Sequence, residues 1–509
     1  MKLFSGIARL FRAVFLLQSR GKQFRLRKLL LNSLTPAFSE KNEDEQMKKV
    51  AVFCIPAHGH TNPMLPVVRE LTRRGDEVRF YSFSEFQEKI ERTGAAFVCC
   101  DKYLPELSTK EAANLKKVST TEMTIQDIRI TAAMDEFLHR EFAAFRPDVV
   151  YTDSVCFWGK LNAWKYDVPM VVSTSTFAFN QMSSTYMKNT PQEIFGLIFG
   201  LPKVSAELNK LKARGYKVKG LFALIQSDNQ TDSVVYTSKK FQPYSESFSD
   251  HYLFAGPSLL TDQKPDKDHE RPLVYISLGT VINDRPDFYG KCIDALKGEN
   301  VDVIISCGKS VDTADFGELP GNVRVYSSVD QPEVLSRADA FITHCGMNSV
   351  SESLYMATPM VLYAQTNEQE AVARRVREIG AGTDLKDDSP AGIRETVRKV
   401  LNTPSYKNAA QECCDDFRNC PGVEGAADFI ENAPHSSDGA DIIRDLSKAN
   451  VGLQIGYSLL TILLANILFR FIRIKYLWIY IILAIVLSVP VNRLLQKAVY
   501  KRLVRTKRK

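Results

Sequence analysis

The sequence predicts an α/β protein built from two doubly wound domains, and three observations carry that prediction. Between Met47 and about residue 433, short apolar runs alternate with amphipathic stretches. The apolar runs are continuous, which is typical of parallel strands buried on both faces of a sheet. The pattern restarts at 272–280, after a polar segment, 256–272, that contains three prolines and indicates a linker. We therefore expect two Rossmann-like sheets whose strand ends face each other across a ligand-binding cleft.

The expected elements follow in order along the chain. In the first half a helix is predicted at 63–75, ending at Gly75, and apolar runs predict strands at 49–56, 77–82, 95–100, 148–153 and 169–174. In the second half the predicted strands are 272–280, 301–308, 322–328, 339–344 and 359–364. The resulting division is an extension at 1–46, a first domain at 47–254, a linker at 255–271, a second domain at 272–433, a linker at 434–451, a membrane hairpin at 452–492 and a basic tail at 493–509.

Charge is distributed unevenly along the 509 residues, whose net charge is +7. Residues 1–36 carry eight Lys and Arg, and residues 470–509 carry eleven, with no acidic residue in either segment. Removing these nineteen positive charges leaves −12 for the middle of the chain. An acidic body with basic ends argues against a nucleic-acid partner and favours termini that meet an anionic membrane lipid surface.

The ten cysteines show no regular spacing, and four of them form two adjacent pairs, at 99–100 and 413–414. Adjacent cysteines are a poor start for structural disulfides, so a reducing compartment is expected. The cluster "CCDDFRNC" at 413–420 fits no zinc-ligand spacing, and we predict no metal there.

Both ends of the chain suggest a membrane location. Residues 1–46 begin with a basic amphipathic pattern, although Met47 opens a stretch typical of a protein start, which would make 1–46 a mis-assigned extension. Two apolar runs, 452–469 and 476–491, predict either a membrane hairpin or one span plus an interfacial helix, and two buried helices are the alternative. The eight basic residues from Arg493 onward predict a cytoplasmic tail, and if the two runs form a hairpin, the catalytic domains are expected in the cytoplasm as well.

The stretch "THCGMNSVSESLYMATP" at 343–359 places a glycine turn between a predicted strand and a predicted helix. In such sheets, ligands bind beyond the strand ends, where helix N-termini present unpaired N–H groups. Gly346 would let the backbone approach a ligand, the amides of 347–349 and His344 would donate to anionic oxygens, and Glu352 would reach hydroxyl groups. This pattern suits a diphosphate with a ribose attached. Alternatively, Ser349 and Glu352 form a capping box that only closes a helix.

Three further strand ends carry polar residues that fit the same ligand. Thr280 closes "ISLGT", Gln331 precedes the helix "PEVLSRA", and Glu368 with Gln369 opens the helix at 367–376. Because all four ends belong to one predicted sheet, we expect them to converge on one nucleotide-like molecule.

Four segments of the chain resemble a known family. The segments 329–382, 53–71, 147–154 and 253–259 are similar to family 1 glycosyltransferases of the bacterial macrolide-glycosyltransferase and UDP-glycosyltransferase type. The resemblance covers residues 48–432 and implies the GT-B fold, two Rossmann-like domains facing across a cleft, to which the sequence adds a C-terminal membrane segment.

The resemblance also implies roles for the predicted site residues. The diphosphate would be held by His344 and the amides of Gly346, Asn348 and Ser349, assisted by Thr280; Glu352 would bind the ribose, Gln331 the nucleobase, and Glu368 and Gln369 the sugar hydroxyls. Many members stack a Trp on the nucleobase three residues before that Gln, where this chain has Ser328. The choice between uridine and thymidine donors is therefore open.

The catalytic residues are expected at the ends of two strands of the first domain. "AHGHTNP" supplies His58 and His60; His60 matches the family's catalytic base, and a metal pair lacks a third ligand at suitable spacing. Asp153 ends the strand at 148–153 and would orient the imidazole and stabilise its charged form, unless it only caps the following helix.

We thus predict inverting transfer of a hexose, from UDP-glucose, to a hydroxyl group of a hydrophobic small molecule or lipid, with no cofactor and no metal. The Asp-x-Asp at 266–268 lies in the linker, and a helix N-terminus would stabilise the leaving diphosphate. A sugar-nucleotide epimerase and a non-catalytic, membrane-tethered nucleotide-sugar-binding protein are the alternatives. The acceptor pocket is expected at 175–204, which contains aromatic residues and Met, although ordinary helix packing explains such a segment at least as well.

Overall fold

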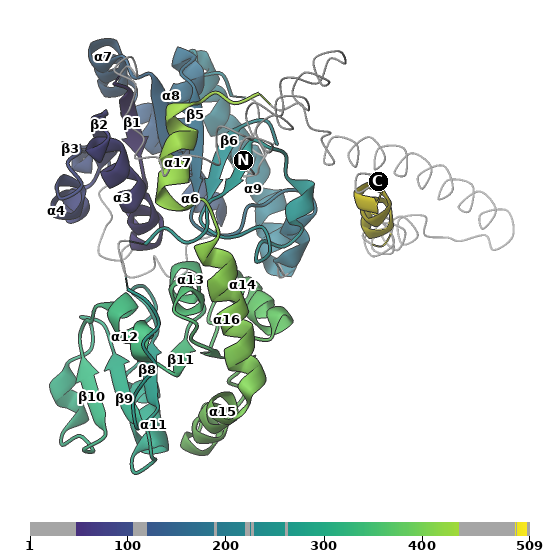
Figure 1. Cartoon of the computed structure of the whole chain (residues 1–509). Helices are drawn as coiled ribbons and strands as arrows, with labels where there is room; N and C mark the ends of the chain where they lie inside the picture. Colours follow the sequence, from purple (N-terminus) through teal and green to yellow (C-terminus); the bar gives the residue numbers. More distant parts are fainter. Residues whose placement is uncertain are drawn as a thin grey trace, which may run out of the picture. The chain divides into compact units, whose positions relative to one another are not determined.

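The computed structural model describes residues 47–104, 120–187, 191–218, 224, 229–259, 263–436, 494 and 496–505. All of these except Met47 belong to one compact unit, Lys48–Lys509. Two parallel β-sheets with their surrounding helices form the framework of this unit (Figure 1).

The first sheet, among the described residues, has seven strands in the order β3-β2-β1-β4-β5-β6-β7, and the pairings are parallel. The strands are β1 (Lys49–Phe53), β2 (Glu77–Ser82), β3 (Ala96–Cys99), β4 (Val149–Asp153), β5 (Met170–Thr174), β6 (Asp232–Val235) and β7 (Tyr252–Phe254). Every residue of β4 and β5 is buried, as expected for central strands with both faces covered.

The second sheet, within the same described part of the chain, has six strands in the order β10-β9-β8-β11-β12-β13, again parallel. They are β8 (Leu273–Ser277), β9 (Asp302–Ser306), β10 (Val323–Tyr326), β11 (Ala340–Thr343), β12 (Met360–Leu362) and β13 (Gly382–Asp384). The continuous apolar runs of the sequence correspond to these strands, with the ends trimmed by a few residues.

Helices connect the strands and cover the sheets. In the first half they are α3 (His58–Arg73), α4 (Gln87–Glu91), α6 (Thr120–Ala133), α7 (Asp135–Phe145), α8 (Phe157–Tyr166) and α9 (Pro191–Ala213). In the second half they are α11 (Pro286–Leu296), α12 (Gln331–Arg337), α13 (Met347–Tyr355), α14 (Asn367–Ile379), α15 (Pro390–Asn402), α16 (Pro404–Arg418) and α17 (Gly422–Glu431). Local signals set several ends: Thr366 caps α14 by accepting from the Gln369 amide, and Gly380 ends it at φ 80°.

The strand order reverses at one point in each sheet, and the predicted site residues lie at those points. The first sheet reverses between β1 and β4, which are followed by His60 and ended by Asp153. The second reverses between β8 and β11, which are followed by Thr280 and His344. In open α/β sheets, the crossovers leave on opposite faces at such a point and leave room for a ligand beyond the strand ends.

The predicted fold class needs one correction. The two parallel α/β sheets agree with the prediction, but the added membrane segment is not supported, because no described helix is both long enough and apolar enough to cross a bilayer. Helix α9, with 23 residues, ends in a charged half that includes Lys203, Glu207 and Lys210. The segments 1–46 and 452–492, for which the amphipathic extension and the hairpin were predicted, lie outside the described residues.

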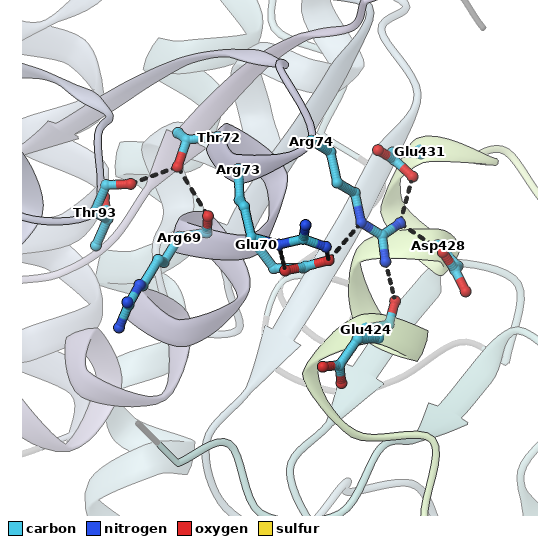
Figure 2. A network of polar contacts seen from close by, with 9 residues as sticks. All are labelled: Arg69, Glu70, Thr72, Arg73, Arg74, Thr93, Glu424, Asp428 and Glu431. Atoms are coloured by element: carbon cyan, nitrogen blue, oxygen red, sulfur yellow. Dashed lines mark hydrogen bonds and ion pairs between the residues drawn. The ribbon is translucent and has the colours of Figure 1, made fainter. Parts of the chain in front are cut away.

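Helix α17 returns to the first sheet, although it follows the second half in sequence. It packs against α3 (Figure 1), and Ala426, Ala427 and Ile430 share a buried apolar cluster with residues of β1 and α3. Polar contacts from Arg74, at the end of α3, hold it there (Figure 2). The Arg74 guanidinium donates to Glu70 (2.8 Å), Glu431 (2.7 Å), the Glu424 carbonyl (3.0 Å) and Asp428.

The two halves also share a hydrophobic core. Phe177, Tyr186 and Phe241 of the first half lie in one buried cluster with residues of α13, α14 and α16. Arg375 of α14 donates to the carbonyl of Phe241 (2.8 Å), and the hydroxyl group of Tyr186 donates to Glu378. Helix α14, whose start carries the predicted sugar-binding residues, therefore packs against the first half.

Candidate functional site

The turn after β11 leaves the N-terminus of α13 open. The helix begins at Met347 with Gly346 as N-cap, and Gly346 has no side chain that could accept from the first-turn amides. The first turn also has no acidic residue. These amides, together with the positive end of the helix dipole, are available to an anion. The capping-box interpretation of Ser349 and Glu352 is wrong, because the helix starts before Ser349.

His344 stands between two glycines. A Cβ added at Gly279 would lie 2.5 Å from Cε1 of His344, and one added at Gly346 would lie 2.4 Å from its Nε2. Real Cβ atoms do not approach other atoms so closely, so both positions need glycine to leave room for the imidazole. Burial lowers the pKa of His344 to about 4. The imidazole is therefore neutral at pH 7 and offers an N–H donor to an anion, not a positive charge.

Gly279→Ala should therefore weaken the binding of UDP by about 10- to 100-fold, the equivalent of one hydrogen bond to a charged group. The new methyl group would displace the His344 imidazole, and calorimetry with UDP would measure the loss. Gly298→Ala is the matched control, because Gly298 has the same positive φ (75° against 76°) with nothing within 4 Å of its Cβ position. Equal UDP affinity in the two variants would show that the position of His344 does not matter for nucleotide binding.

Gln331, Ser349 and Glu352 form one polar group with Tyr275 of β8. The Tyr275 hydroxyl group donates to Oε1 of Gln331 (3.1 Å), and Nε2 of Gln331 donates to Ser349 Oγ (3.2 Å) and to the Glu352 carboxylate. Burial raises the pKa of Glu352 to about 7. The residues predicted to meet the ribose and the nucleobase are thus in direct contact, and Tyr275 fixes which way the Gln331 amide points.

Thr280, Glu368 and Gln369 lie at two other ends of the same sheet. Thr280 is exposed after β8, next to Gly279, and Glu368 is exposed in the first turn of α14. Gln369 accepts from the Gln365 amide through Oε1 (2.8 Å), which closes the turn before the helix. The charge of Glu368 contributes to the pKa of His60, so this side chain lies within electrostatic reach of the first half.

His60 and Asp153 are in direct contact. Nδ1 of His60 lies 2.8 Å from Oδ2 of Asp153, whose side chain is fully buried, while the imidazole is 28% exposed. Oδ1 of Asp153 accepts from the Val155 amide (3.0 Å), which fixes the carboxylate. A carboxylate only accepts, so Nδ1 carries the hydrogen, and Nε2 keeps its lone pair for a substrate proton.

The surroundings of His60 act on its pKa in opposite directions. Burial lowers it, but the charge of Asp153 and the hydrogen bond to it outweigh burial, and Glu368 adds to them, so the pKa lies above its ordinary value. A raised pKa makes the imidazole a stronger base. His58 is placed differently, since its Nε2 lies 3.0 Å from Glu85 and its ring packs edge-on against Phe86.

One hydrogen bond joins the two predicted sites directly. The side-chain amide of Asn348, on α13, donates to the carbonyl of Gly59, the residue before His60 (3.1 Å). The structure therefore places the turn at 344–349 next to the turn that carries His60. Part of the expected acceptor segment lies elsewhere, because Phe177 and Tyr186 are buried in the shared core.

Three residues of the site had no individual role in the prediction. Ser175 follows β5, and its Oγ lies 3.2 Å from Nδ1 of His60; its place at the same sheet edge as Asp153 was a usable signal. Gly279 packs against His344, and this contact depends on the neighbouring strand. Tyr275 lies inside a strand, where the sequence pattern indicates core packing.

The chain is similar to known proteins over about three quarters of its length. Residues 291–431 match the family described as Erythromycin biosynthesis protein CIII-like, C-terminal domain. The chain is 32% identical over 395 residues to the NDP-glycosyltransferase YjiC of Bacillus licheniformis, covering 75% of this chain and 97% of that protein. It is 30% identical over 399 residues to YojK of Bacillus subtilis, named an uncharacterized UDP-glucosyltransferase, covering 76% and 98%. Among solved structures, the calicheamicin glycosyltransferase CalG4 matches with a TM-score of 0.64 and 26% identity, covering 76% of this chain and 98% of that one.

Proposed function

This chain belongs to the family of macrolide and UDP-glycosyltransferases with the GT-B fold, enzymes that use nucleotide sugars, and on that basis we propose that it transfers glucose from UDP-glucose to a hydroxyl group of a hydrophobic small molecule. The contact between His60 and Asp153, beside the open N-terminus of α13, is the observation that carries the proposal. A base and an anion site are the two parts that sugar transfer needs. The comparisons give no support to an epimerase or to a non-catalytic binding protein.

The proposed reaction is a single displacement. Nε2 of His60 removes the proton of the acceptor hydroxyl group, and the oxygen attacks the anomeric carbon of the sugar as the bond from that carbon to the diphosphate breaks. Attack from the side opposite the leaving group inverts the anomeric centre. Asp153 keeps the Nδ1 hydrogen in place and stabilises the imidazolium that forms, as the buried carboxylate of a catalytic triad does.

The leaving diphosphate takes up the electron pair of the broken bond. In the proposal, the first amides of α13 and the N–H of His344 receive its charge, with Thr280 at the edge of the site. Because these donors are built into the turn, we propose that the transfer needs no divalent cation. Gln331 and Glu352 would hold the nucleoside, and Glu368 and Gln369 the sugar hydroxyls.

The choice of donor and acceptor is supported by the relatives and by the sequence. Uridine is favoured over thymidine by the name of the relative YojK, an uncharacterized UDP-glucosyltransferase. Ser328, exposed where many members have Trp, offers no aromatic surface to either base. The expected acceptor segment begins at Ser175, which contacts His60. The sequence of this segment contains aromatic residues and Met, which favours an apolar molecule with a hydroxyl group.

The test is an assay of the full-length protein with UDP-glucose or dTDP-glucose and a panel of hydrophobic phenols and macrolide aglycones. We expect UDP release that depends on the acceptor, a product heavier by one hexose with the β-anomeric configuration, and unchanged activity in EDTA. Activity lost in EDTA and restored by Mg²⁺ or Mn²⁺ would contradict the metal-free reaction. An epimerised sugar nucleotide without a glycoside, or UDP binding without turnover, would overturn the proposed function.

A further inference from the structure

The carbonyl of Gly59, which accepts the hydrogen bond from Asn348, lies one helical turn before a proline of α3. In an α-helix, the carbonyl of residue i accepts from the amide of residue i+4. The residue four positions after Gly59 is Pro63, which lies inside α3 and has no N–H. The carbonyl of Gly59 therefore lacks its usual helical donor. The Asn348 side chain, 289 positions away in sequence, donates to that carbonyl instead, at 3.1 Å.

This bond connects the two turns that the proposed reaction must align. Gly59 precedes His60, whose Nδ1 is fixed by Asp153, so a displacement of the Gly59 carbonyl moves the base. Asn348 is the second residue of α13, and its own backbone amide belongs to the proposed diphosphate site. Helices α3 and α13 are in contact here, although they belong to different sheets.

We propose that Asn348 is a positioning residue, which aligns the His60 turn with the diphosphate turn through the carbonyl that Pro63 leaves without a helical donor. The proposal rests on the proposed function. It adds a role for the side chain of Asn348, since only the backbone amide of this residue was assigned to the diphosphate site.

Asn348→Ala removes the side-chain donor and keeps the backbone amide. A misplacement of reacting groups by about 1 Å lowers rates by about 10²-fold, so we expect kcat to fall by about 10- to 100-fold. The UDP affinity should change by less than about threefold, since the helix N-terminus is intact. The acidic limb of the pH–rate profile should not move, because Asp153 still sets the pKa of His60. Asn348→Gln, which keeps an amide donor, should recover part of the rate.

Pro63→Ala tests the same bond from the other side. The alanine at 63 supplies an N–H that competes for the carbonyl of Gly59, so kcat should fall in the same direction as in Asn348→Ala, by a smaller factor. The effects of the two substitutions should not be additive in the double variant. Pro66→Ala is the matched control, because Pro66 lies in the same helix, is also buried, and leaves a different carbonyl, that of Asn62, without a helical donor. It should leave kcat unchanged.

Hydrogen exchange gives a readout that does not need turnover. The amides of 57–62 should exchange faster in Asn348→Ala than in the wild type, whereas in Pro63→Ala the new helical bond to the carbonyl of Gly59 still holds this turn. If the wild type transfers no sugar to any acceptor, the proposed function fails, while the exchange data still decide whether the bond holds the turn.

Three results would overturn the positioning role. A loss of UDP affinity as large as the loss of kcat in Asn348→Ala would make the side chain a phosphate ligand only. Wild-type kcat in both variants, together with wild-type exchange in Asn348→Ala, would show that the bond has no effect. Equal effects of Pro63→Ala and Pro66→Ala would indicate a general change of α3.

Discussion

His60→Ala is expected to lower kcat by about 10²- to 10⁴-fold, the usual contribution of a general base, while the affinity for UDP stays nearly unchanged. The imidazole that would be lost is partly exposed and is held by Asp153, whereas the groups proposed to bind the nucleotide belong to the other sheet. Steady-state kinetics and calorimetry with UDP measure the two quantities separately. An active His60→Ala enzyme would remove His60 from the reaction, and His58 would be the next residue to test.

Asp153→Asn is the companion variant, and its pH dependence has a definite sign. A base must be neutral, so kcat/KM falls as the pH drops through the pKa of His60. Asp153 raises that pKa, against the opposing effect of burial, and removing its charge should shift the acidic limb to lower pH. The maximal rate should fall as well, since the charged imidazole is no longer stabilised. The effects of His60→Ala and Asp153→Asn should not be additive. A limb that stays in place would contradict the assignment of Asp153.

Arg74→Met is expected to lower the free energy of unfolding by about 3 kcal/mol, near the lower end for the loss of one partner from a buried charged network. The Arg74 side chain is only 13% exposed and contacts Glu70, Glu431 and the carbonyl of Glu424. Methionine keeps the apolar contacts of the stem while removing the charge. Urea unfolding measures the change, and limited proteolysis near α17 shows whether the helix leaves α3.

Arg73→Met is the matched control for this substitution. Arg73 precedes Arg74 and donates to the same Glu70 (2.7 Å), but its side chain is 69% exposed, so solvent screens the pair and little stability should be lost. A hydrogen bond from Arg73 is the largest of the effects that lower the pKa of Glu70. The stabilisation by this carboxylate is therefore complete above its ordinary pKa of 4.5 and is lost as the pH falls through the lower value in the folded state. Equal losses from the two arginine variants would show that burial of Arg74 is unimportant.

The two sheets could be predicted because their strands are buried on both faces. Runs such as "DVVYTD" and "DAFITH" have no polar alternation, and β4 and β11 lie inside them. The return of α17 to α3 could not be predicted in the same way. Its apolar residues, Ala426, Ala427 and Ile430, have the spacing of any amphipathic helix, and nothing in that spacing names the surface they cover. Which surface α17 covers is decided by tertiary packing.

Within the site, the sequence was informative where a residue's position alone decides its role. The turn at 344–349 and Asp153 could be predicted because each lies at the end of a strand beside the point where the strand order reverses. The structure places both of them there. The protonation state of His344 could not be predicted, because its lowered pKa depends on burial between residues of two strands. The bond from Asn348 to Gly59 could be only half anticipated: Pro63 predicts a carbonyl without its helical donor, but the sequence does not show which donor takes its place.

The position of α17 has a consequence for how the polypeptide is made. A nascent chain emerges from the ribosome at about 5–20 residues per second, and its N-terminal parts begin to fold first. The apolar side of α3 that meets Ala427 and Ile430 is uncovered until those residues, some 350 positions later, have been synthesised. For tens of seconds the growing chain thus presents an unfinished hydrophobic face, which chaperones that bind such faces would shield. A release of the chain before α17 should leave a product prone to aggregation, even though every strand of the first sheet is already present.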